Sequence, residues 1–255
     1  MTVSSARVAV YRSAPPAIAR SAGRARRLLP RLVGWLAICA TGWIGWGVAQ
    51  AHGIAGDDQA FLLRATGAHI GPYIYLGAKH MVTGYDHLLF LAGVIFFLYR
   101  LKDVAVYVTL FAIGHSTTLL IGVLGGWHVD AYLVDAVIGL SVVYKAFENL
   151  GGFTHLGFQP NTKAAVLFFG FFHGLGLATK LQDLALSKDG LVANMVSFNI
   201  GVEIGQLLAL GLILIAFNVW RRTGGFLRHA FAGNIVLMIA GFVLAGFQLT
   251  GYFVS

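Results

Sequence analysis

Histidine and carboxylate side chains stand inside segments of the chain that are otherwise almost wholly apolar. Imidazole and carboxylate groups together suit borderline divalent ions such as nickel, cobalt, zinc and copper(II). Because ionisable groups are costly in hydrocarbon, a cluster of them indicates a function. We therefore predict a metal site inside a membrane. Its candidate ligands are His80, Asp86, His87, His115, His173 and Glu203.

The spacing of these residues indicates which of them share a helical face. His80 and His87 are seven residues apart, so one continuous helix would place them on nearly one face, two turns from each other. Asp86 projects about 100° away from His87 and is able to orient an imidazole. Asparagine, glutamate and glutamine at positions 199, 203 and 206 form a polar stripe. Four further polar side chains are expected to support the site: Glu148, Asn149, Asn199 and Gln206.

Other charges in the same segments favour structural roles. Lys145 and Glu148 are three residues apart on a predicted helix, so we expect them to neutralise each other. Asp135 lies near the start of the same helix and is expected to be a hydrated charge at its outer end.

The composition favours a membrane protein. The chain is 58% hydrophobic and 11% charged, whereas soluble domains are nearer half apolar and a quarter charged. This excludes a disordered chain and an ordinary cytosolic enzyme. We predict an all-α, polytopic membrane helix bundle with six transmembrane helices, near residues 78–99, 104–124, 131–150, 163–181, 191–219 and 231–252. Small-xxx-small spacings at Gly170–Gly174 and Gly201–Gly205 predict close helix packing.

The N-terminal part is typical of a targeting segment. Seven arginines precede residue 32, an apolar run follows, and Ala49-Gln50-Ala51 ends it. Residues 1–51 are therefore predicted to be a signal peptide or an N-terminal anchor helix, 52–77 an extracytoplasmic segment and 78–255 the six-helix domain. The formal charge of +8 comes mostly from these arginines, so a nucleic-acid partner is not indicated. The predicted location is the cell (inner) membrane, with the mature N-terminus and the C-terminus extracytoplasmic.

Five motifs resemble those of a known family. His80–Phe90 resembles the H-x-x-x-G-x-D-H-L-L-F stretch of the HupE/UreJ family, membrane proteins associated with hydrogenase and urease maturation. The resemblance covers roughly residues 75–210 and continues through Gly114–Leu119, Glu148–Leu150, Phe172–Gly176 and Phe198–Gln206. It implies a six-span, permease-like protein with suspected nickel or cobalt transport, and a metalloenzyme maturation system as a partner.

Three functions remain open from the sequence. The first is a passive permease for a divalent transition metal ion, nickel before cobalt, in contact with the lipid bilayer. The second is an accessory or assembly protein for a metalloenzyme. The third is an intramembrane zinc-type metalloenzyme, although neither an H-E-x-x-H nor a G-x-S-x-G motif is present in the sequence.

Overall fold

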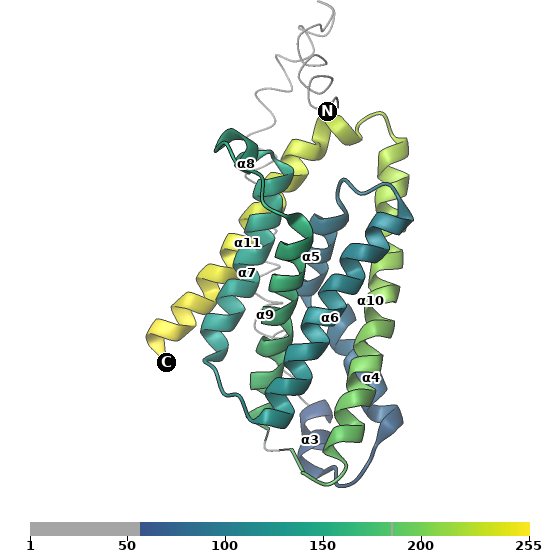
Figure 1. Ribbon diagram of the computed structural model, residues 1–255, viewed down its shortest axis with the longest axis vertical. Helices are drawn as coiled ribbons and strands as arrows, with labels where there is room; N and C mark the ends of the chain where they lie inside the picture. The colour runs from purple at the N-terminus through teal and green to yellow at the C-terminus, as the bar shows by residue number, and fades with distance from the viewer. Residues whose placement is uncertain (1–56, 185) are drawn as a thin grey trace, which may run out of the picture. The chain divides into compact units, whose positions relative to one another are not determined.

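All regular secondary structure in the described part of the chain is helical. The structure is a computed structural model that describes residues 57–184 and 186–255, and no strand occurs among them. This confirms the all-α class. Residues 1–51, predicted to be a signal peptide or anchor helix, lie outside the described residues. The helices in Figure 1 are α3 (Asp57–Arg64), α4 (Ile70–Thr83), α5 (Tyr85–Ile95), α6 (Leu101–Gly125), α7 (Ala131–Asn149), α8 (Gly152–His155), α9 (Thr162–Gln182), α10 (Leu191–Arg222) and α11 (Phe226–Val254).

Among the described residues, four helices have the length and apolar composition needed to cross a membrane: α6, α9, α10 and α11. The outer face of α10 exposes large apolar side chains such as Leu207, Leu212 and Ile215, as a lipid-facing helix does. Helix α7 carries three charged side chains, and α4 and α5 are each too short to cross alone. The described chain therefore has the helices of a multi-pass membrane protein, and the count of six spans stays a prediction.

The first predicted span differs from the structure. Instead of one helix near 78–99, the chain forms α4 and α5, which meet at Gly84. The Gly84 N–H donates to the His80 carbonyl at 2.8 Å and closes α4. Gly84 itself then leaves the helical region, with ψ at 100°. Glycine has low helix propensity, which favours a break of the helix at this position. His80 and His87 consequently do not share one continuous helix.

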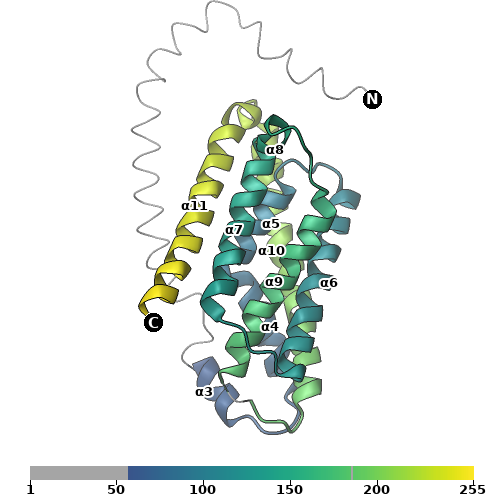
Figure 2. The same ribbon diagram turned by 60° about the vertical axis from the view of Figure 1, so that its left-hand side comes forward.

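Glycines bring the helices together in close pairs. A Cβ built on Gly170 would lie 2.6 Å from the Phe111 carbonyl oxygen, and one on Gly174 would overlap the His115 carbonyl, so α9 packs directly on α6. Figures 1 and 2 show these two helices side by side. The predicted close packing at Gly170–Gly174 is confirmed.

Glycines also allow α4 to pack closely on α10, and α7 on α11. A Cβ on Gly201 would overlap the Ile74 carbonyl, and one on Gly205 would lie 2.6 Å from the Ala78 carbonyl oxygen. The close packing predicted at Gly201–Gly205 is thus also confirmed. Gly139 leaves a corresponding space for the Ala245 backbone of α11. Three tightly crossed helix pairs form the frame of the bundle.

The charges of α7 pair within the bundle. Lys145 Nζ donates to Glu148 Oε2 at 2.7 Å, which confirms their predicted neutralisation. Asp135 is only 4% exposed and forms a 2.7 Å ion pair with Lys180 of α9. The expectation of a hydrated charge at this position was wrong, because α9 covers this face of α7 with its own cation.

Candidate metal site

The break at Gly84 places two imidazoles against each other. His80 lies near the end of α4 and His87 near the start of α5, with ring centroids 5.1 Å apart. A Cβ on Gly84 would lie 3.0 Å from His87 Nδ1 and 3.1 Å from Asp86 Oδ1. Glycine at this position therefore leaves room for the side chains of Asp86 and His87 to meet beside the end of α4.

We expect Gly84→Ala to weaken metal binding by about tenfold, because the added methyl presses on the Asp86–His87 contact that orients the imidazole. Isothermal titration of the purified protein with Ni²⁺ measures the change. Gly71→Ala in α4 is the matched control, since its Cβ would meet nothing within 4 Å. Equal Ni²⁺ affinities of the two variants would show that Gly84 matters only for the break between α4 and α5, and not for the Asp86–His87 contact.

Three imidazoles from three other helices gather around His87. Its ring centroid lies 5.1 Å from that of His80, 5.5 Å from that of His115 on α6 and 4.6 Å from that of His173 on α9. His87, His115 and His173 are at most 2% exposed, whereas His80 is partly buried. Helices α4, α5, α6 and α9 thus converge on one cluster, which we call the imidazole cluster: His80, His87, His115 and His173.

Two sets of potential ligand atoms occur in this cluster. His80, His87 and His115 offer one set, and Asp86, His87 and His173 offer the other; within each set the atoms lie within 4.8 Å of one another. Nitrogen ligands of a metal such as zinc stand about 2.0–2.1 Å from the ion, so an ion bound by either set would draw its ligand atoms closer together. His87 belongs to both sets.

Asp86 fixes the orientation of the central imidazole. Its Oδ1 accepts from His87 Nδ1 at 2.8 Å and from the His87 backbone N–H at 2.8 Å. A carboxylate that accepts from one ring nitrogen leaves the other with its lone pair available to a metal ion. That nitrogen, His87 Nε2, is buried and has no hydrogen-bond partner among the described residues. Asp86 therefore orients the His87 imidazole. Its carboxylate also belongs to one of the two sets of potential ligand atoms.

The other buried imidazoles also present nitrogen atoms without partners. Both ring nitrogens of His115 and Nδ1 of His173 are buried and accept or donate no hydrogen bond within the described residues. Buried polar atoms are nearly always hydrogen-bonded in folded proteins. Several unsatisfied nitrogens that face one another are what a cation site presents before its ion binds.

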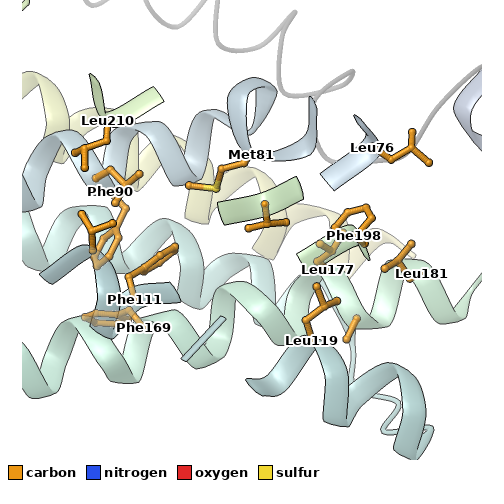
Figure 3. Close-up of a cluster of buried hydrophobic side chains, with 14 of the residues drawn as sticks. Leu76, Met81, Phe90, Phe111, Leu119, Phe169, Leu177, Leu181, Phe198 and Leu210 are labelled. Atoms are coloured by element: carbon orange, nitrogen blue, oxygen red, sulfur yellow. The ribbon is translucent and has the colours of Figure 1, made fainter. Parts of the chain in front are cut away.

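An aromatic layer closes the imidazole cluster on one side. Phe90, Phe111 and Phe169 each stand about one helical turn from an imidazole of their own helix, on α5, α6 and α9. Phe90 lies 5.5 Å from Phe111 and 5.9 Å from Phe169, between ring centroids. Figure 3 shows the three rings together within the apolar core. Phe111 and Phe90 also contact the His173 ring, at 5.0 and 5.4 Å.

Glu203, the sixth predicted ligand, lies apart from both sets. It is exposed on α10 and belongs to neither group of ligand atoms. The close contact of Gly201 and Gly205 with α4 fixes which face of α10 turns inward, and Glu203 falls beyond the edge of that face. Asn199 and Gln206, from the same stripe, are buried.

The four predicted supporting residues mostly make helix-packing contacts. Asn149 Nδ2 donates to the Gly93 carbonyl at 2.8 Å and to Asn234 Oδ1 at 2.9 Å. Glu148 accepts from Thr162 as well as from Lys145. Each of these contacts lies within or between helices and none includes a cluster imidazole. The other two supporting residues donate to backbone carbonyls: Asn199 Nδ2 to that of Met195, and Gln206 Nε2 to that of Val108.

One residue in contact with the cluster was missed from the sequence. Ser141 of α7 is 0% exposed, and its Oγ lies 3.3 Å from His173 Nε2. A single serine in an apolar helix carries no signal of its own, because serine commonly packs in membrane helices.

The fold and the cluster define a class: a helical membrane protein with buried imidazoles and a carboxylate gathered in its interior. A family model described as HupE / UreJ protein matches residues 56–255. The chain belongs to the HupE/UreJ family, which confirms the resemblance seen in the motifs. Comparison with curated proteins and with solved structures finds no match.

Proposed function

We propose that this protein is a membrane permease for a divalent transition metal ion, with nickel as the first candidate and cobalt as the second. The observation that carries the proposal is the set of buried nitrogens of His87, His115 and His173 that have no hydrogen-bond partner among the described residues. They converge from separate helices within a bundle whose long helices suit a membrane. Handling of metal ions also accords with the family.

The donor set favours borderline ions over soft ones. The cluster offers imidazole nitrogen and carboxylate oxygen, which suit Ni²⁺, Co²⁺, Zn²⁺ and Cu²⁺. The only cysteine of the chain, Cys39, lies outside the described residues and within the predicted targeting segment. The described residues therefore offer the site no thiolate, the ligand that favours copper(I). A competition experiment among the divalent ions is needed to identify the ion that is carried.

The surroundings of the cluster give the proposed path a direction. His80 is partly buried and the other three imidazoles are deeply buried, so the ion enters from the His80 side. The aromatic layer of Phe90, Phe111 and Phe169 stands on the opposite side. Release requires the helices that carry these rings to separate, and the ion gradient or a coupled proton provides the driving force.

The orientation follows from the basic residues at one end of the bundle. Arg100 lies in the connection between α5 and α6, and Lys102 lies in the first turn of α6. Arg221 and Arg222 are the last two residues of α10. Figure 1 shows both connections at the same end. By the positive-inside tendency this end faces the cytoplasm, so the aromatic layer lies on the cytoplasmic side of the imidazoles and both mature termini lie outside.

Uptake of radioactive nickel by proteoliposomes tests this proposal. We expect saturable uptake above that of empty vesicles, with competition by excess Co²⁺ stronger than competition by Mg²⁺, because Mg²⁺ prefers oxygen ligands. A protein that binds nickel without moving it across the bilayer would contradict the permease and favour an accessory role. Saturable uptake of cobalt but not of nickel would contradict the order of the two substrates.

A further inference from the structure

The hydroxyl of Ser141 has only one hydrogen, and the distances to its two neighbours indicate which of them accepts it. Ser141 Oγ lies 2.6 Å from the Ile138 carbonyl oxygen. A carbonyl oxygen only accepts, so the serine hydrogen is donated to it. The second contact of the hydroxyl, with His173 Nε2 at 3.3 Å, then requires the ring to donate and the serine oxygen to accept.

This contact selects one tautomer of His173. A neutral imidazole carries a single N–H, so a hydrogen on Nε2 leaves Nδ1 with a free lone pair. His173 Nδ1 is buried and has no hydrogen-bond partner within the described chain. Asp86 selects the opposite tautomer of His87, where Nδ1 donates and Nε2 is left without a partner. The two touching imidazoles thus offer different nitrogens to the same interior.

We propose that Ser141 is a positioning residue that holds His173 in its Nε2–H tautomer and directs Nδ1 to the metal ion. The consequence for metal binding rests on the proposed function; the tautomer itself does not. The arrangement parallels that of metal-binding histidines, whose second ring nitrogen donates to an oxygen that fixes the ring. Here a serine hydroxyl, itself anchored on the Ile138 carbonyl, does what Asp86 does for His87.

The first test measures the tautomer in the metal-free protein. Histidine-labelled protein at pH 8 is examined by ¹⁵N NMR, with His173 assigned from a His173→Gln variant. Threonine and valine have nearly the same shape: Ser141→Thr adds a methyl and keeps the hydroxyl, whereas Ser141→Val has a methyl in place of the hydroxyl. We expect the Nε2–H tautomer in wild type and in Ser141→Thr, and loss of that preference in Ser141→Val. An Nδ1–H tautomer in wild type, or the same spectrum in both variants, would overturn the proposal.

The second test measures the effect on metal affinity. We expect Ser141→Val to bind Ni²⁺ about tenfold more weakly than Ser141→Thr, as other losses of an orienting partner do. Ser197→Ala is the matched control, since that buried hydroxyl donates to the Ala193 carbonyl within α10. Equal affinities of the Thr and Val variants would overturn the positioning role.

Two outcomes are kept distinct by this design. If the wild-type protein binds no metal, the proposed function fails, while the NMR comparison still decides the role of Ser141. If the added methyl prevents folding of both variants, Ser141→Ala against wild type repeats the comparison without added volume, and an unchanged His173 tautomer there overturns the proposal.

Discussion

Replacing His87 with alanine is expected to abolish nickel uptake and to lower the affinity for Ni²⁺ by more than about 100-fold, beyond the usual effect of losing an orienting partner. His87 is the central ring of the imidazole cluster and the one histidine that belongs to both sets of ligand atoms. Its loss removes a ligand whichever set the ion uses. It also leaves Asp86 without the ring that it orients.

The matched control is His155→Ala, because His155 is an exposed imidazole of α8 whose Nδ1 contacts the Gly151 carbonyl. This variant is expected to transport at the wild-type rate. Both proteins must elute as the same species in detergent, so that a loss of uptake reflects the site rather than misfolding. Uptake by His87→Ala close to that of His155→Ala would mean that the ion is carried elsewhere.

The two ligand sets predict a further difference between the surrounding histidines. His115→Ala removes one set and leaves Asp86, His87 and His173, while His173→Ala leaves His80, His87 and His115. Each single variant is therefore expected to retain measurable Ni²⁺ binding, at lower affinity, and the double variant to lose it. Calorimetric titration of the three proteins distinguishes this from one site that needs all four rings, where each single variant would already bind nothing.

The candidate ligands could be identified from the sequence because they are ionisable residues within apolar segments. An imidazole or carboxylate within an apolar segment is unusual enough to stand out without any structure, and the structure brings His80, Asp86, His87, His115 and His173 together. The all-α class and the approximate positions of the last five helices followed from apolar runs with polar breaks between them. These are local properties, which a sequence carries directly.

What could not be read from the sequence depends on how helices face one another. Glu203 shares a polar stripe with two buried amides, and only the contact of Gly201 with α4 decides that it turns outward. Gly84 resembles any other glycine in an apolar segment until the chain is seen to leave the helix there. Ser141 contacts His173, which lies 32 residues further along the chain, so no local sequence pattern predicts this contact.

Replacing Gly201 with leucine is expected to destabilise the bundle by about 3 kcal/mol or more, at or beyond the upper end of overpacking effects. Even the first carbon of a side chain at this position would overlap the Ile74 carbonyl of α4. A backbone atom cannot rotate away as a side chain does, so α4 and α10 must separate. Their separation removes the close backbone contact by which the two helices pack without large side chains between them.

The same helix provides the control. A Cβ on Gly211 of α10 would meet nothing within 4 Å, so Gly211→Leu changes the same residue type without forcing any helix apart. Thermal unfolding in detergent, followed by circular dichroism, is expected to show a much lower midpoint for Gly201→Leu than for Gly211→Leu. Because α4 carries His80, Gly201→Leu should also weaken nickel binding although residue 201 offers no ligand. Equal unfolding midpoints of the two variants would mean that α4 and α10 do not pack closely at Gly201. The packing of α4 that places His80 in the cluster would then be contradicted.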